Sequence, residues 1–233
     1  MRSWLVPAAA ALLGGAIGAG AMLAYADTRG AGSGDVRTYL LTHPEVIPEA
    51  MQRLQQKEAG SVVAANRAAI VTPFGSAWAG NPRGDVTLVE YYDYNCGYCR
   101  ASLPMIRQLI ERDPKLKVVF RELPILAESS RSAARISLAA AAQGKFNAFH
   151  DALYAAGRVS DDSIAAAART AGIDTAALPA LAPRIDAEIA RNMEVAAKLG
   201  VSGTPSWVVG DRVLSGALPI EELERAIAEA RPS

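Results

Sequence analysis

Apolar and polar positions follow different patterns along the chain, and the first segment is apolar almost throughout. Residues 4–26 carry no charged side chain, and Arg2 is the only charge before them. Such a run matches an export signal, with residues 24–26 (AYA) as a small-x-small cleavage pattern. It is also long enough to span a bilayer, with Arg2 favouring a cytoplasmic N-terminus. Residues 1–26 are therefore interpreted as a signal peptide or a membrane anchor, and both interpretations place the rest of the chain outside the cytoplasm.

Residues 35–66 show a helical pattern with one apolar stripe. Ile47, Met51 and Leu54 recur at i, i+4 and i+7, while Gln, Arg, Lys and Glu cover the other side. This spacing places the three apolar side chains on one face of a helix. The pattern predicts a helical arm, whose stripe either packs on its own domain or pairs with another copy of the chain.

Turn and cap signals delimit this arm. Residues 27–34 are small, polar and Gly-rich, which predicts a flexible linker. Thr42 is followed three residues later by Glu45, which predicts a capping box at a helix start. Pro, Gly, Asn and Asp cluster at residues 72–85 and indicate a domain boundary. The linker and the arm are thus assigned to residues 27–83.

Residues 84–233 alternate between strand and helix patterns. Residues 86–92 are β-branched and aromatic, which predicts a strand. A second strand at 116–120 follows after one helix, and this short β-α-β spacing favours a parallel pair. An Ala-rich helical block at about 127–200 comes next, and we expect breaks in it at Gly144, Gly157, Gly172, Pro179 and Pro183. A hairpin and an amphipathic helix close the chain.

Composition narrows the classes of protein. Apolar residues make up 51 % of the chain and charged residues 21 %, which is the mixture of a protein with a packed core. The formal net charge is zero, which argues against nucleic acid as the main partner. His43 and His150 are the only histidines, and Cys96 and Cys99 the only cysteines. This inventory disfavours a structural zinc site, and we interpret both histidines as surface or capping residues.

The Cys96-Gly97-Tyr98-Cys99 segment carries the candidate chemistry. Two cysteines at this spacing can bind a metal, form a static bridge, or cycle between dithiol and disulfide. The pair directly follows a predicted strand and opens a helix, whose free N–H groups stabilise a thiolate on Cys96. A second thiol one turn deeper can resolve a mixed disulfide. The position therefore favours a redox-active pair, with Cys96 as the attacking thiol and Cys99 as the resolving thiol.

Three further positions near the pair are candidate site residues. Glu90 shares one strand face with apolar neighbours, so it is either a buried carboxyl with a raised pKa that shuttles a proton for Cys99, or a solvated edge-strand acid. Thr204-Pro205 precedes a strand and is a suitable place for a cis peptide bond. Asp93 is either functional or a turn residue at the strand end.

Four tyrosines surround the cysteine pair in the sequence. Tyr91, Tyr92 and Tyr94 precede it, and Tyr98 lies between the two cysteines. They are candidates for lining a peptide groove. We expect Tyr98 to be exposed and at least two of the four to be core residues.

The DYNCGYC segment, the helical block and the GVSGTP segment together resemble the DsbA family of exported thiol–disulfide oxidoreductases. The resemblance covers roughly residues 84–233 and implies an α/β, thioredoxin-like fold with an inserted helical domain. It implies that Cys96 is the reactive thiol, that Pro205 is cis and packs against the disulfide, and that Glu90 occupies the acidic position of the first central strand. The arm is similar to the N-terminal oligomerising segments of ScsC-like and Com1-like members, so it implies a homo-oligomer.

Two positions depart from the best-known DsbA pattern. The dipeptide between the cysteines is Gly97-Tyr98 rather than Pro-His, and Thr204 replaces Val before the proline. Both are similar to the choices of the disulfide isomerase DsbC. The dipeptide tunes thiolate stability, and the Thr204 hydroxyl is placed to hydrogen-bond near the sulfurs or to a bound peptide. We therefore assign Gly97, Tyr98 and Thr204 to substrate binding.

These observations lead to one expected function and two alternatives. We expect an exported, periplasmic enzyme, with no bound cofactor, that exchanges disulfides with the cysteines of other exported proteins and leans towards isomerase or reductase. A membrane redox partner would reset the pair, and no nucleic acid is involved. The first alternative is a DsbA-type dithiol oxidase. The second is a non-enzymatic copper or zinc handling protein that uses the same thiols.

Overall fold

The computed structural model describes residues 35–231, which divide into two units, one ending at Gln55 and one beginning at Gln56. The interpretations of residues 1–26 and 27–34 concern segments outside the described residues. Between residues 35 and 231, no helix is both long enough and apolar enough to cross a membrane.

The described part of the first unit is helical, with a break that the sequence misplaces. A short helix covers residues 35–42, and the next helix, α2 (Val46–Val71), begins in this unit. Thr42 ends the first helix instead of capping the second, because its hydroxyl donates to the Thr38 and Tyr39 carbonyls at 2.9 and 3.0 Å. This backward bond satisfies carbonyls at a helix end. The predicted capping box is therefore wrong.

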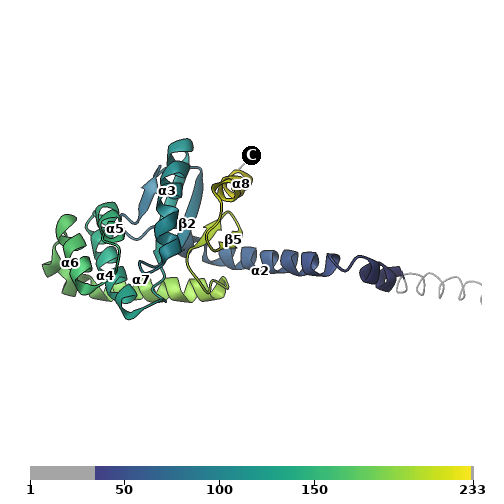
Figure 1. Cartoon of the computed structure of the whole chain (residues 1–233), viewed down its shortest axis with the longest axis horizontal. Helices are drawn as coiled ribbons and strands as arrows, with labels where there is room; N and C mark the ends of the chain where they lie inside the picture. The colour runs from purple at the N-terminus through teal and green to yellow at the C-terminus, as the bar shows by residue number, and fades with distance from the viewer. Residues whose placement is uncertain (1–34, 232–233) are drawn as a thin grey trace, which may run out of the picture. The chain divides into compact units, whose positions relative to one another are not determined.

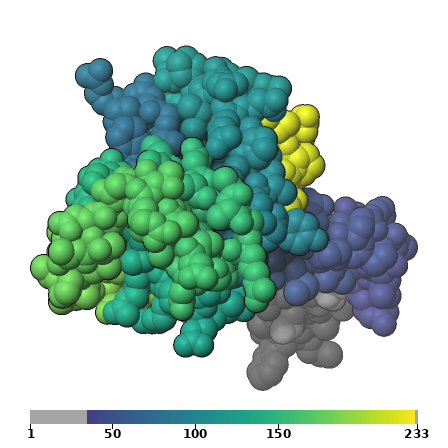
Figure 2. All heavy atoms as spheres, turned by 60° about the vertical axis from the view of Figure 1, so that its left-hand side comes forward, coloured from purple at the N-terminus to yellow at the C-terminus, as the bar shows by residue number. Residues whose placement is uncertain are grey.

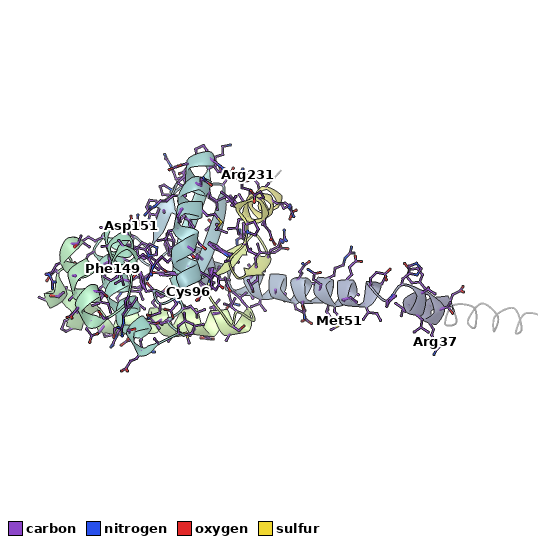
Figure 3. All side chains as sticks on the ribbon, in the orientation of Figure 1. Arg37, Met51, Cys96, Phe149, Asp151 and Arg231 are labelled. Atoms are coloured by element: carbon purple, nitrogen blue, oxygen red, sulfur yellow. The ribbon has the colours of Figure 1, made fainter. Side chains whose placement is uncertain are left out.

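The stripe predicted for the arm is present on α2. Ile47, Met51 and Leu54 all have exposed side chains, and Figure 3 labels Met51 on this helix. Val63 and Ile70, farther along α2, are buried in the second unit. The same helix thus changes from an exposed apolar stripe to a packed face along its length.

A five-stranded sheet forms the centre of the second unit, in the order β1-β3-β2-β4-β5. The strands are β1 (Trp78–Gly80), β2 (Val86–Tyr92), β3 (Leu116–Glu122), β4 (Ser206–Val209) and β5 (Arg212–Ser215). Strands β2 and β3 are parallel, as the β-α-β spacing predicts, and the other neighbours are antiparallel. Strand β1 lies within residues 72–85, where the sequence predicts a domain boundary. Three strand residues among turn formers are too few to give a strand pattern.

Strand β3 runs two residues past the predicted end at Phe120. Arg121 and Glu122 look like the polar end of a strand, yet both are buried. Arg121 pairs with the buried Glu188 and donates to the carbonyls of Ile70 and Thr72. A buried guanidinium is tolerated only with such partners.

Helices cover both faces of the sheet, so β2 and β3 are buried along nearly their whole length. One face packs with α3 (Gly97–Arg112), α8 (Ile220–Ala230) and inserted helices. The other face packs with the second half of α2 and the end of α7 (Leu178–Lys198). This two-sided burial makes the sheet a rigid support for the loops at its ends.

The helical insertion lies between β3 and β4. Its other helices are α4 (Glu128–Ala142), α5 (Phe146–Ala155), α6 (Asp161–Thr170) and the 3-10 helix η1 (Thr175–Ala177), and α4, α5 and α6 lie together in Figure 1. Figure 2 shows these helices in green as one face of the second unit. Breaks occur at Gly144, Gly157 and Gly172, as expected, with φ angles of 74°, 83° and 64°. A helix boundary also falls at Pro179, because η1 ends at Ala177 and α7 begins at Leu178, with Pro179 in its first turn. The expected break at Pro183 is absent, because α7 continues through this residue.

Candidate active site around the cysteine pair

Cys96 occupies the N-cap position of α3, at the end of this helix marked in Figure 3. The Cys99 amide donates to Cys96 Sγ at 3.3 Å, and the Cys96 amide donates to the Asp93 carbonyl at 2.9 Å. An amide directed at a sulfur at a helix N-terminus stabilises the sulfur as an anion. Both cysteines are free thiols in this structure. Cys96 therefore lies at the start of the helix, where the sequence places it, and its sulfur accepts a backbone hydrogen bond there.

The loop before β4 brings a second segment to Cys96. The Thr204–Pro205 peptide bond is cis, as the resemblance implies, and Cys96 Sγ donates to the Thr204 carbonyl at 3.1 Å. The loop is held by the Ser206 hydroxyl, which donates to the Gly203 carbonyl at 2.8 Å. The Thr204 hydroxyl oxygen is buried and has no hydrogen-bond partner among the described residues. The Thr204 carbonyl, directly before the cis bond to Pro205, therefore lies against the first sulfur.

Glu90 and Cys99 form the buried side of the pair. Each is 1 % exposed, and Glu90 lies on β2, the central strand of the sheet, so the edge-strand alternative is wrong. Burial, followed by the charges of Cys96 and Glu122, raises the pKa of Glu90 well above its usual range. Burial, followed by the charge of Glu90, also raises the pKa of the Cys99 thiol. A buried carboxyl with a raised pKa thus acts electrostatically on a buried thiol that must lose a proton to react.

The dipeptide between the cysteines faces solvent. Tyr98 is 68 % exposed, as expected, and a side-chain carbon added at Gly97 would meet no heavy atom within 4 Å. Tyr91, Tyr92 and Tyr94 are fully buried. Tyr98 is therefore the only one of the four candidate tyrosines available to a bound peptide.

A buried polar cluster beside Glu90 was missed by the sequence analysis. Tyr92 donates to Glu122, Tyr94 donates to Ser137 at 3.0 Å, and the Tyr94 hydroxyl lies 3.1 Å from His150 Nδ1. The prediction that His150 is a surface or capping residue is wrong, because it is buried in an aromatic cluster. Burial, with a smaller contribution from the Arg107 charge, lowers the pKa of His150 to about 3, so this imidazole is neutral at physiological pH.

Glu122 makes the stability of the fold depend on pH. Burial raises its pKa from 4.5 to about 8, against the opposing effect of the hydrogen bonds from Ser137 and Tyr92. The unfolded chain therefore loses this proton first, and stability falls as the pH rises from about 4.5 through about 8. Between pH 5 and pH 9, the free energy of unfolding should therefore fall less in Glu122→Gln than in wild type. The difference should be a few kcal/mol, because each pKa unit corresponds to ~1.4 kcal/mol.

Urea unfolding at the two pH values measures this difference. Glu194→Gln, on the exposed surface of α7, is the matched control and should behave as wild type. Equal losses in Glu122→Gln and wild type would contradict the assignment of this loss of stability to Glu122.

Comparison with known proteins agrees with this geometry. Residues 87–228 match the DSBA-like thioredoxin domain family, and residues 36–59 match the copper resistance protein ScsC N-terminal domain. A thioredoxin-like oxidoreductase from Silicibacter pomeroyi is 43 % identical, with a TM-score of 0.67 over 71 % of this chain and 98 % of that one. Proteus mirabilis ScsC, in a transitional conformation, is 29 % identical, with a TM-score of 0.65 over 84 % of this chain and 93 % of that one.

Two further matches differ in how much of the relative they cover. A periplasmic thioredoxin-like protein from Salmonella enterica serovar Typhimurium is 33 % identical, with a TM-score of 0.62 over 72 % of this chain and 96 % of that one. Among curated proteins, the Na⁺/H⁺ antiporter NhaA 1 of Salinispora arenicola is 33 % identical over 150 residues, which is 62 % of this chain. The chain spans only 23 % of that relative's length.

The DSBA-like family match covers more than half of the chain. The expected α/β, thioredoxin-like fold with a helical insertion and a preceding helix is confirmed. The chain therefore belongs to the DsbA-like family of thiol–disulfide oxidoreductases and carries an ScsC-type N-terminal segment.

Proposed function

We propose that the chain exchanges disulfides with cysteines of other exported proteins through Cys96 and Cys99. The Cys96 thiolate attacks a substrate disulfide, forms a mixed disulfide and releases one substrate thiolate. Cys99 then loses its proton to Glu90 and attacks the Cys96 sulfur, which releases the second substrate thiol and leaves a Cys96–Cys99 disulfide. The asymmetry of the pair carries this proposal, because an amide donates to the Cys96 sulfur, while burial and the charge of Glu90 raise the pKa of the Cys99 thiol.

We propose that the protein acts as a disulfide isomerase or reductase rather than as an oxidase. Gly97-Tyr98 and Thr204 support this direction by their similarity to DsbC, and Thr204 contacts Cys96 through its carbonyl. A dithiol oxidase is the alternative, because the Cys99 amide stabilises Cys96 as a thiolate and a stabilised reduced form makes a stronger oxidant. Copper or zinc handling is a second alternative, favoured by the match of residues 36–59 to the copper resistance protein ScsC N-terminal domain.

Reactivation of scrambled ribonuclease by the reduced protein tests the direction. We expect reactivation that disappears in Cys96→Ser, because only a reduced attacking thiol can reopen wrong disulfides. Oxidation of reduced ribonuclease by the oxidised protein, without reactivation of the scrambled form, would support the oxidase instead. Failure of both reactions would move the assignment to metal handling.

The exposed stripe on α2 is proposed to assemble copies of the chain. Changing Ile47, Met51 and Leu54 together to Ser should convert an oligomer to a monomer, because burial of the stripe provides the hydrophobic stabilisation of the contact. The triple variant is preferable to a deletion of residues 35–66, since a deletion would also remove Val63 from the core of the second unit. Light scattering gives the mass. An unchanged oligomer in the triple variant, or a monomeric wild type, would contradict this proposal.

The compartment and the resetting partner complete the proposal. Because a relative at 33 % identity is periplasmic by name, we propose that this chain also works outside the cytoplasm, on exported cysteine-containing proteins. A membrane redox partner would return the pair to its working state.

A further inference from the structure

The Asp93 carboxylate is the most heavily hydrogen-bonded group near the cysteine pair, and the mechanism proposed above does not use it. Asp93 is 1 % exposed. Its Oδ1 accepts from the backbone amide of Asn95 at 2.8 Å and from the Ser130 hydroxyl at 2.7 Å. Its Oδ2 accepts from the amides of Ile125 and Leu126 at 2.9 and 3.0 Å. The two oxygens thus have separate duties, one towards the cysteine turn and α4, the other towards the loop after β3.

The backbone of Asp93 joins this loop to the nucleophile. Its carbonyl accepts from the Cys96 amide at 2.9 Å and from the Tyr154 hydroxyl at 3.3 Å. One residue therefore fixes both the start of α3 and the segment that carries Ile125 and Leu126. A loop held by two backbone amides keeps its position without burying its own side chains.

The side chains of that loop are apolar and exposed. Ile125 is 38 % exposed and Leu126 51 % exposed, and these two adjacent side chains form what we call the apolar patch. Within residues 56–231, the patch contains two of the four exposed large hydrophobic side chains, the others being Tyr98, between the cysteines, and Met193. Exposed apolar side chains gathered at one place mark an interaction site. The patch is continuous with the thiol site, because Asp93 ties its loop to the Cys96 turn.

We propose that Asp93 is a positioning residue for substrate binding, which holds Ile125 and Leu126 beside Cys96 so that the patch contacts apolar residues flanking a substrate cysteine. This proposal rests on the proposed thiol–disulfide exchange. The occupant is an extended segment of a substrate protein, since any cysteine that reaches Cys96 brings its neighbouring residues over this surface. The contact selects substrates and takes no part in the transfer of electrons.

Asp93→Asn separates the two duties of the carboxylate. An amide has one accepting oxygen and one donating NH₂ group. If the oxygen stays towards Asn95 and Ser130, whose hydroxyl can rotate, the NH₂ group opposes the amides of Ile125 and Leu126 and releases their loop. Leu126→Ser removes one side chain of the patch at the surface and leaves every Asp93 contact in place, so it tests the patch even if Asp93→Asn folds poorly.

The test compares two short peptides, each with one cysteine held as a mixed disulfide with glutathione. One peptide has Leu and the other Ser on both sides of the cysteine. The reduced full-length protein converts each to peptide thiol and glutathione, its own pair becomes a disulfide, and dithiothreitol reduces the pair again. We expect wild type to show a KM about tenfold lower for the Leu peptide, the equivalent of ~1.4 kcal/mol. In Asp93→Asn and Leu126→Ser the KM for the Leu peptide should rise to that of the Ser peptide, with kcat changed by less than about twofold.

The control and the contrary outcomes keep the two proposals apart. Asp174→Asn is the matched control, because Asp174 accepts from the Ala176 amide at the start of η1, outside the Asp93 contacts, and should keep the wild-type preference. A wild type that reacts equally well with both peptides overturns the role of the patch and leaves the exchange function standing. A kcat loss of similar size on both peptides in Asp93→Asn would make Asp93 a general support of the Cys96 turn and overturn the proposal. A wild type that reacts with neither peptide overturns the exchange function itself.

Discussion

Cys99→Ser is expected to accumulate stable mixed disulfides with its substrates, whereas Cys96→Ser should form almost none. The reason is the unequal environment of the two sulfurs. Cys96 Sγ receives an amide hydrogen bond and lies against the loop of Thr204 and Pro205, while Cys99 is buried and its thiol has a raised pKa. Attack by Cys96 needs no help from Cys99, but release of the mixed disulfide does.

Trapping of a glutathione or peptide mixed disulfide, followed by mass spectrometry without reductant, measures this difference. We expect trapped adduct on Cys99→Ser at least about a hundredfold above Cys96→Ser, because the thiolate rather than the thiol is the nucleophile. The double variant, with both cysteines replaced by Ser, sets the background. Equal trapping by the two single variants would show that the roles of attacking and resolving thiol are assigned wrongly.

The sequence could predict the cysteine pair because its signals are local. A strand pattern, two cysteines and a helical pattern follow one another within residues 86–112, and the helix start orients the first sulfur. The cis bond before Pro205 and the exposure of Tyr98 were predicted in the same way, the first from a turn before a strand and the second from its place between the cysteines.

The parts that could not be predicted depend on contacts between distant residues. The sequence allows Glu90 to be buried or solvated, because its burial depends on whether β2 is a central strand. The position of β2 depends in turn on its pairing with β3 and β4. Glu122 looked like a residue beyond the strand end, since its partners Tyr92 and Ser137 are far away in the sequence. Strand β1 forms only because β3 offers it a partner.

His150 is a different case, because a local signal existed. It follows Phe146 by four residues and precedes Leu153 by three, so it shares the buried face of α5. Its polarity suggested the surface, but the helical spacing would have indicated burial. Asp93 could be functional or a turn residue, and its hydrogen bonds to the backbone amides of Ile125 and Leu126 could not be predicted, since these partners are 32 and 33 residues away in the sequence.

Glu90→Gln is expected to slow the resolution of the mixed disulfide at neutral pH by about a hundredfold, within the range for a lost general base. Two effects of this change oppose each other. Gln cannot take the proton from Cys99, but it also removes the charge that raises the pKa of that thiol. Burial is the larger cause of the raised pKa of Cys99 and stays in the variant, so the loss of the proton acceptor should dominate.

The pH dependence gives the sign. The carboxylate form of Glu90 is the base, and it appears as the pH rises through a pKa well above the usual 4.5. Wild-type resolution should therefore accelerate with rising pH through that pKa, and Glu90→Gln should lose the inflection and keep only the dependence of Cys99 ionisation. Near the top of the pH range the two rates should converge, because hydroxide replaces the missing base.

A disulfide that releases a coloured thiolate separates the two steps. With Ellman's reagent, attack by Cys96 releases the first coloured thiolate and resolution by Cys99 releases the second. In a series of measurements from pH 5.5 to pH 9, Glu90→Gln should slow the second release at neutral pH and leave the first within about threefold, since the amide that stabilises Cys96 is unchanged. Glu111→Gln, an exposed change on α3, is the control. An unchanged second release with the wild-type inflection would exclude Glu90 as the proton acceptor.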